Sequence, residues 1–227
     1  SENENEETIQ LLKFIENLKN KVKFKVEKKS LSDLKNWDYS EKKTIYNIKK
    51  NFFSIKGFST SSSLKNIDNY DQPLIVQDEI GILGFIVKKI DGILYFLVQA
   101  KIEPGNINII QLSPTLQATK SNYQLKHGGG EPDYMHYFFN VSKENLLFDV
   151  LLSEEGTRFF KKRNRNMIVY VDDDIQLKDN FKWMTLKQLK SLMQFDNKVN
   201  RCARSVISLI NYSLNDISNN KSAKKDI

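Results

Sequence analysis

Residues 80–102 read IGILGFIVKKIDGILYFLVQAKI, and this stretch decides the fold. Two runs rich in β-forming residues, 80–90 and 93–102, are joined by Asp91-Gly92, a dipeptide typical of the two-residue type I′ turn. With these two residues as the loop, each residue of one strand faces a fixed partner on the other. The predicted pairs are Lys88 with Tyr95, Ile86 with Leu97, Gly84 with Gln99 and Ile82 with Lys101.

The second strand of this hairpin separates two kinds of side chain by alternation. We expect one face in the core: Leu94, Phe96, Val98, Ala100 and Ile102. The opposite face changes from apolar to polar along its length: Tyr95, Leu97, Gln99, Lys101 and Glu103. Because Gly84 has no side chain, we predict a hollow beside Gln99 that a ligand can enter. A bulge or a simple bend at Gly84 is the alternative.

Further elements are predicted on both sides of the hairpin. Helical spacing predicts an amphipathic helix over 6–20 and a short one over 30–34, and a strand is expected over 51–58 before the polar loop 59–69. Downstream we predict strand over 109–123, broken at Ser113-Pro114, a glycine turn at 128–130, a helix over 146–163 and a strand over 167–171. Two helices follow, one from Thr185 with a capping box to Gln188 and one over 200–212.

Composition indicates a globular chain. Of its 227 residues 40% are hydrophobic, enough for a sizeable core, and we expect a single α+β domain over 1–214 with a polar, disordered tail over 215–227. The apolar stretches are too short for a membrane helix, and residues 1–7 lack the features of a secretory signal, so we predict a cytoplasmic protein without membrane contact. The single cysteine, Cys202, excludes an internal disulfide and is expected to be buried.

The net charge of +7 and the pI near 9.2 raise the possibility of a nucleic-acid-binding module. Lysines are scattered from Lys13 to Lys225 among acidic residues rather than gathered on one element. This distribution is typical of a solvated surface, so we predict no nucleic-acid partner.

A series of separate motifs extends from Trp37 to Leu209. They are PLIVQDEIGILGF at 73–85, QAKIEPGN at 99–106, QLSPTLQAT at 111–119, SNY at 121–123, HGG at 127–129, SEEGTRF at 153–159, RNRN at 163–166 and ARSV at 203–206. In order and spacing these motifs resemble the NDP-4-keto-6-deoxyhexose 2,3-dehydratases, enzymes of deoxysugar biosynthesis.

The resemblance implies a Nudix-like α+β fold, a mixed sheet flanked by helices, without Nudix hydrolase chemistry. Glu154-Glu155 is the nearest match to the metal-binding acidic pair of Nudix hydrolases, but its Gly, Arg and Glu companions are missing, so we predict no metal. Family members typically carry two tandem copies of this unit, whereas this sequence has one. We therefore expect a homodimer in which the second subunit replaces the second copy.

The reaction that the resemblance implies is a dehydration by a hydro-lyase without a redox cofactor. A 4-keto group acidifies the C3 proton, a base removes it, and the 2-hydroxyl leaves as water. Lys101 and Glu103, neighbours on one strand face, are the predicted acid–base couple with either assignment open, and a surface ion pair is the alternative. His127 and Tyr134 are further catalytic candidates, with a turn histidine and a half-buried core tyrosine as the structural alternatives.

Substrate binding is assigned to arginines and to a row of polar side chains. Residues 158–165 hold five basic residues near the predicted end of a helix, and we expect Arg163, Arg165 and Arg204 to bind the diphosphate; a favourable helix C-terminus is the alternative. The polar candidates for the sugar and base are Gln99, Asn106, Gln111, Ser113, Thr115, Gln117, Thr119, Ser121, Asn122 and Tyr123, of which some must cap turns around Pro114.

The expected substrate is a dTDP- or UDP-linked 4-keto-6-deoxyhexose, and a 3-ketoreductase is expected to act next in the pathway. A second reading is a catalytically silent subunit that binds nucleotide sugars or partners such an enzyme.

Overall fold

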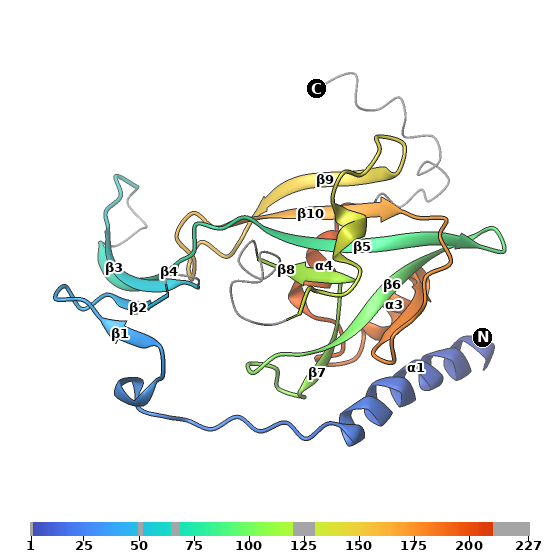
Figure 1. Cartoon of the computed structure of the whole chain (residues 1–227), viewed down its shortest axis with the longest axis horizontal. Helices are drawn as coiled ribbons and strands as arrows, with labels where there is room; N and C mark the ends of the chain where they lie inside the picture. Colours follow the sequence, from blue (N-terminus) through green and yellow to red (C-terminus); the bar gives the residue numbers. More distant parts are fainter. Residues whose placement is uncertain (1, 50–51, 65–68, 120–129, 211–227) are drawn as a thin grey trace.

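The computed structural model describes residues 2–49, 52–64, 69–119 and 130–210, which form two β-sheets and a few helices (Figure 1). The main sheet has the order β11-β6-β5-β10-β9, with β7 beside β6 and β8 beside β5. Its strands are β5 (Gly81–Ile90), β6 (Ile93–Ile102), β7 (Ile110–Ser113), β8 (Leu116–Ala118), β9 (Leu146–Ser153), β10 (Arg163–Tyr170) and β11 (Phe181–Thr185). Because β10 runs parallel to β5 while the other pairs are antiparallel, the predicted mixed α+β sheet is confirmed.

The hairpin is confirmed at its tip. Asp91 and Gly92 have φ angles of 49° and 79°, as a type I′ turn requires, and Lys88 pairs with Tyr95. Beyond Val87 the two strands separate. Gly84 then pairs with Leu116 on β8, and Gln99 pairs with Ser113 on β7, so the predicted pairings of Gly84 with Gln99 and of Ile82 with Lys101 are wrong.

Thr115 explains this separation, because its side chain occupies the point where the strands part. Its Oγ1 accepts a hydrogen bond from the Ile86 amide at 2.9 Å and donates one to the Leu97 carbonyl. The hydroxyl thus takes the place of a direct backbone pairing between β5 and β6. We call the region where the two strands separate, edged by β7 and β8, the fork.

The hollow predicted beside Gln99 depends on the space that Gly84 leaves free, and that space is filled. The ring of Phe138, from the 3₁₀ helix η2 (Met135–Phe138), lies over this glycine, and a Cβ added at Gly84 would meet Phe138 Cε1 at 2.1 Å. The glycine therefore admits a core phenylalanine, so the close approach that its position indicates is to another part of the chain rather than to a ligand.

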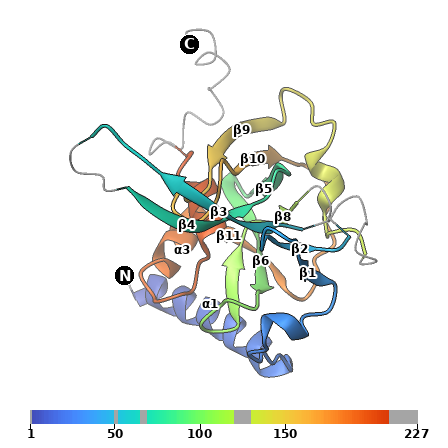
Figure 2. The same cartoon turned by 90° about the vertical axis from the view of Figure 1, so that its left-hand side faces the viewer.

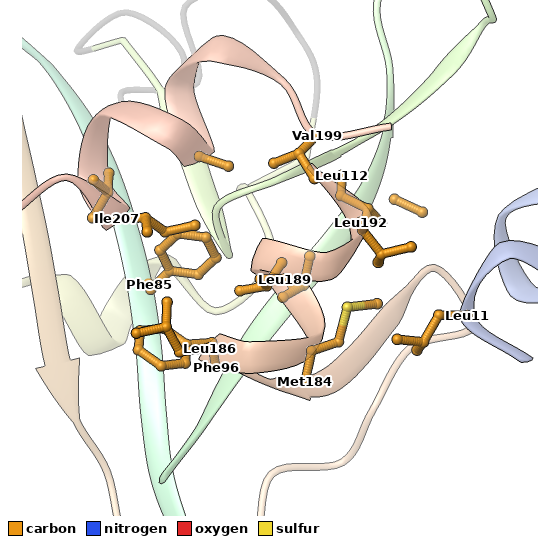
Figure 3. Close-up of a cluster of buried hydrophobic side chains, with 14 of the residues drawn as sticks. Leu11, Phe85, Phe96, Leu112, Met184, Leu186, Leu189, Leu192, Val199 and Ile207 are labelled. Atoms are coloured by element: carbon orange, nitrogen blue, oxygen red, sulfur yellow. The ribbon is translucent and has the colours of Figure 1, made fainter. Parts of the chain in front are cut away.

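Two apolar clusters lie on opposite faces of the main sheet. One face is covered by α1 (Glu2–Lys21), α3 (Leu186–Leu192) and α4 (Arg201–Ile207). Figure 3 shows side chains of α3 and α4 near Phe85 and Phe96, with Leu11 of α1 on the Met184 side of the same cluster. The capping box predicted at Thr185 is confirmed. The expected core face of β6 is confirmed as well, since Phe96, Val98 and Ala100 are buried in this cluster. The other cluster packs under η2.

The helix predicted over 146–163 is wrong, because residues 146–153 form the edge strand β9, paired antiparallel with β10. The apolar residues of this segment fit a helical spacing, but an edge strand that is partly exposed on both faces shows no clear alternation to indicate a strand. The basic stretch 158–165 therefore follows a strand and enters β10 at Arg163. The alternative that these basic residues lie at a helix C-terminus is wrong as well.

A smaller sheet has the order β1-β2-β3-β4 and faces the viewer in Figure 2. It consists of β1 (Trp37–Tyr39), β2 (Ile45–Asn47), β3 (Ser54–Thr60) and β4 (Tyr70–Val76), of which only β3 was expected from the sequence, three residues upstream. Ile75 connects this sheet to the loop before β10: its amide donates to the Arg158 carbonyl and its carbonyl accepts from the Phe160 amide, each at 2.9 Å. Phe58 stacks on Phe160 with ring centroids 4.4 Å apart.

The remaining elements agree in part with expectation. The short helix near residue 30 is the 3₁₀ helix η1 (Leu31–Asp33), and α4 is shorter than the predicted 200–212. The predicted tail over 215–227 lies outside the described residues, and the single-domain boundary at 214 stays a prediction. Within the described ranges, no helix has the length and apolar character needed to span a bilayer.

Candidate active site at the fork

The fork is closed on its inner side by residues 198–200. The Leu112 amide donates to the Lys198 carbonyl and the Asn200 amide to the Leu112 carbonyl, both at 2.8 Å, so Val199 forms a single parallel bridge with Leu112 of β7. Asn200 is the N-cap of α4. The helix therefore starts inside the fork and brings its first residues beside the polar ends of β6 and β8.

A directed chain of hydrogen bonds crosses the fork from Asn200 to Glu103. Asn200 Nδ2 donates to Gln117 Oε1 at 2.9 Å, and Gln117 Nε2 donates to Glu103 Oε1 at 2.7 Å. Asn200 is 5% exposed, while Gln117 and Glu103 are half-buried. Gln117 and Glu103 were both expected at the site; Asn200 was missed, although its place at the start of a predicted helix is the signal of an N-cap.

Lys101 and Cys202 lie at the same end of the fork. Lys101 is half-buried on β6 and pairs with Gln111 in the β7 register. Burial raises the pKa of the Cys202 thiol to about 11; Glu103 adds to the rise, whereas Arg201 and Lys101 oppose it. The predicted couple, Lys101 and Glu103, is therefore within electrostatic range of one thiol on α4. The expected burial of Cys202 holds only in part, since its overall exposure is intermediate.

Two of the predicted sugar-binding hydroxyls are part of the frame. Ser113 is fully buried and donates within its own turn to the Pro114 carbonyl at 3.0 Å, and Thr115 is 2% exposed at the base of the fork. Gln99 is half-buried, with its Oε1 3.4 Å from Ser113 Oγ. These positions favour the turn-capping alternative for Ser113 and Thr115.

The β6–β7 loop carries two more of the candidates. Asn106 Nδ2 donates to the Ile109 carbonyl at 3.1 Å and lies 3.4 Å from the Lys101 carbonyl, and Gln111 Nε2 donates to Asn108 Oδ1 at 3.3 Å. Ile109 has a φ of 70°, rare for a β-branched residue. The Asn106 side chain thus stabilises the strained β6–β7 loop next to the Lys101 carbonyl. Thr119 is half-buried just past β8.

The candidate arginines fall on two elements. Arg163 and Arg165 are two residues apart on β10, so they share one face of that strand. Arg165 forms a bidentate ion pair with Asp149 on β9, with 3.0 Å from Nε to Oδ1 and 2.6 Å from Nη2 to Oδ2. Arg204 is exposed on α4, with Nε 3.4 Å from the Asn200 carbonyl.

A second polar cluster fixes α4 to β10. Glu154 forms an ion pair with Arg201 and accepts from Asn164 Nδ2 at 2.7 Å. Asn164 Oδ1 accepts from the Gly81 amide at 3.2 Å. Glu154 therefore has partners within the fold that fix the start of α4. Across the described residues, no group of three or more histidine, cysteine or carboxylate side chains is arranged to hold a metal ion.

Tyr134, the aromatic catalytic candidate, lies in a structural contact. Tyr134 Oη donates to the Gln176 carbonyl at 2.8 Å and accepts from the Lys178 amide at 3.0 Å, so it fastens η2 to the loop before β11. His136 is exposed beside Tyr137. The predictions for Ser121, Asn122, Tyr123 and His127 lie outside the described residues.

A family model described as NDP-hexose 2,3-dehydratase matches residues 8–210. The chain belongs to this family. The match spans both sheets, the fork and α4.

Three curated relatives carry the name dTDP-4-dehydro-6-deoxy-alpha-D-glucopyranose 2,3-dehydratase. The protein from Saccharopolyspora spinosa is 46% identical over 70% of this chain and 33% of its own length. That from Amycolatopsis orientalis is 50% identical over 63% and 30%, and that from Streptomyces violaceoruber 35% identical over 82% and 42%. The chain thus spans less than half the length of these relatives.

Among solved structures, the chain is similar to one titled "Crystal structure of ADP compounds hydrolase". The TM-score is 0.41 at 11% identity, with 80% of this chain and 94% of the other covered.

Proposed function

We propose that this chain supplies the active site of an NDP-4-keto-6-deoxyhexose 2,3-dehydratase, a hydro-lyase whose substrate is dTDP-linked. Family membership and the common name of the three relatives support this assignment. The observation that carries it is the position of Lys101 and Glu103 at the end of β6, beside a helix start, with both side chains half-buried. An acid and a base held two residues apart suit a reaction that moves one proton off carbon and another onto oxygen.

In the proposed reaction one member of the couple takes the C3 proton. The C3–H electron pair forms the C3–C4 double bond of an enolate, and its charge lies on O4. Collapse of the enolate re-forms the C4 carbonyl, moves the C3–C4 π pair into a C2–C3 double bond and breaks the C2–O bond. The other member of the couple gives a proton to the departing hydroxyl, which leaves as water. Electrons balance without an oxidant or a metal, and the resulting enol tautomerises to a 3-keto sugar that a 3-ketoreductase consumes.

The diphosphate is assigned to Arg163 and Arg165. Both guanidinium groups project from one face of β10, and arginine pairs with phosphate oxygens in a fork geometry. Arg165 is already matched to the carboxylate of Asp149 with this geometry, which a phosphate can replace. Arg204, on α4 near Asn200, is the third candidate. We expect Arg163→Met to raise KM for the nucleotide sugar about tenfold or more while kcat changes little, because a phosphate contact remote from C3 contributes to ground and transition state alike.

A homodimer in the cytoplasm remains part of the proposal. The curated relatives are more than twice as long as the segment they share with this chain, and we propose that a second subunit takes the place of part of that additional length. Light scattering after gel filtration tests this directly: a mass near twice 26.5 kDa is expected, and a monomer at enzyme-assay concentrations contradicts it.

The activity is tested by turnover. The protein is mixed with dTDP-4-keto-6-deoxyglucose, a 3-ketoreductase and NADPH, and we expect the 2-deoxy sugar nucleotide to form. Lys101→Met and Glu103→Gln are expected to lower the rate at least a hundredfold. Lys89→Met, which removes an exposed lysine near the Asp91-Gly92 turn, is the matched control and is expected to leave the rate unchanged. Tight binding of the nucleotide sugar without product, at any enzyme concentration, favours the catalytically silent subunit.

A further inference from the structure

The hydrogen-bond chain across the fork has a fixed direction. The Ala203 amide donates to Asn200 Oδ1 at 2.8 Å, which is the N-cap bond of α4. A backbone amide only donates, so Oδ1 must be the acceptor and the Asn200 side-chain amide cannot be flipped. Nδ2 is then the atom that faces Gln117.

The orientation of Asn200 determines that of Gln117. Because Asn200 Nδ2 donates, the Gln117 atom that it meets at 2.9 Å must be the oxygen. The nitrogen of Gln117 is thereby turned toward Glu103 and donates to Oε1 at 2.7 Å. The orientation of a helix cap is thus transmitted through two primary amides to one carboxyl oxygen.

Glu103, at the end of this hydrogen-bond chain, is left with one carboxyl oxygen for chemistry. Its Oε1 is committed as an acceptor, and within the described parts of the chain Oε2 has no hydrogen-bond partner. With one oxygen held by an amide donor, the carboxylate presents Oε2 as an acceptor, which is what a general base requires. Lys101 lies two residues earlier, at the end of β6, and an ammonium group is a hydrogen-bond donor only.

We infer that Gln117 and Asn200 are positioning residues that hold Glu103 as the general base, with Oε2 directed to the C3 proton, and leave Lys101 as the acid for the 2-hydroxyl. This inference rests on the proposed function, and it assigns the two roles that the sequence leaves open. It also changes the role of Gln117, whose amide acts on Glu103 rather than on the sugar.

The sharpest perturbation is Asn200→Asp. Aspartate caps a helix as well as asparagine does, so α4 keeps its N-cap bond from Ala203. The second carboxylate oxygen then faces Gln117, whose amide must turn over to donate to it, and Gln117 presents its oxygen to Glu103. This one substitution therefore reverses the direction of the hydrogen bonds between residues 200, 117 and 103, and α4 keeps its N-cap.

We expect Asn200→Asp to lower kcat at least tenfold, to leave KM within about threefold, and to move the acidic limb of the kcat/KM profile to higher pH, since the base now ionises against a neighbouring oxygen. Gln117→Met, which breaks the chain and leaves the cap untouched, is expected to change the profile in the same direction by less. Asn197→Asp is the matched control: it adds the same charge three residues away on an exposed turn, and its profile is expected to overlay that of the wild type.

A second measurement is independent of turnover. The ¹³C carboxyl signal of Glu103, assigned by its loss in Glu103→Gln, is titrated in the wild type, in Asn200→Asp, in Gln117→Met and in Asn197→Asp. A midpoint at higher pH in Asn200→Asp, and by less in Gln117→Met, but not in Asn197→Asp, supports the positioning role even if no dehydratase activity is found. An unchanged midpoint in Asn200→Asp and in Gln117→Met overturns the inference, whatever the activity; an unchanged midpoint with normal turnover leaves the proposed function standing without it.

Discussion

Gly84→Ala tests the packing beneath the fork. An added Cβ would lie 2.1 Å from Cε1, 2.7 Å from Cδ1 and 2.8 Å from Cζ of Phe138, against about 3.5–4.0 Å for an ordinary carbon contact. Phe138 is 1% exposed, so its ring can retreat only by displacing other core side chains. Overpacking of this kind costs about 1–3 kcal/mol, and we expect the upper end of that range, about 3 kcal/mol, which corresponds to a fall in Tm of about 6–12 °C.

Urea unfolding followed by circular dichroism measures this loss. Gly57→Ala is the control, because a Cβ there meets no atom within 4 Å, and a change within about 0.5 kcal/mol is expected. Phe138→Leu makes room for the added methyl group. The double variant Gly84→Ala/Phe138→Leu is therefore expected to lose at least about 1 kcal/mol less unfolding free energy than the two single variants together. A loss below about 0.5 kcal/mol for Gly84→Ala, or additive effects in the double variant, refutes the packing argument.

Three further predictions concern the frame of the site. Thr115→Val keeps the shape but leaves two buried backbone groups unpaired at the base of the fork, and about 1–3 kcal/mol of unfolding free energy should be lost in the same urea assay. Glu154→Gln weakens the ion pair to Arg201 and should cost about 1–3 kcal/mol, whereas Glu155→Gln, whose carboxylate is exposed and 3.8 Å from that arginine, should cost less than about 0.5; equal effects would contradict this assignment. Because burial raises the pKa of Cys202 from 9.0 to about 11, iodoacetamide at pH 8 should alkylate it about 100-fold more slowly in the folded protein than in the unfolded chain.

The same thiol gives a pH dependence of stability with a definite sign. The folded-state pKa lies above the unfolded value, so the Cys202 thiol is protonated in both states below pH 9 and its contribution is fully present there. From about pH 9 to 11 the unfolded chain loses the proton first, so stability should fall relative to Cys202→Ala as pH rises. A difference between the two proteins that stays constant over this range contradicts the burial of the thiol.

Local signals in the sequence were sufficient where the structure depends on neighbours in the chain. Asp91-Gly92 determines the turn and the pairing next to it, and Thr185 with Gln188 determines the start of α3. Both rest on backbone angles or hydrogen bonds within a few residues.

Long-range insertions were not predictable in the same way. The hairpin register fails beyond Val87 because Thr115, almost thirty residues away, inserts between the strands. The glycine at 84 signals a close approach, but the sequence does not identify Phe138 as the side chain that approaches. Strand β9 was missed because an edge strand with both faces partly exposed has no alternation to distinguish it from a helix.

In the candidate site as well, local groupings were predictable and long-range contacts were not. Residues on one strand, such as Lys101 and Glu103, were grouped by alternation alone. The arrangement across the fork, in which Asn200 contacts Gln117 over a separation of 83 residues, depends on where α4 begins. The motif resemblance marked Gln117, and only the fold reveals that its partner is a helix cap.

The central claim is that Glu103 and Lys101 at the fork carry out the dehydration, and proton exchange at C3 tests it most directly. In D₂O, the wild-type protein with dTDP-4-keto-6-deoxyglucose is expected to exchange or eliminate at C3, as followed by ¹H NMR. Glu103→Gln is expected to bind the nucleotide sugar within about threefold of the wild type and to show no C3 exchange. Exchange at the wild-type rate in Glu103→Gln would contradict the account.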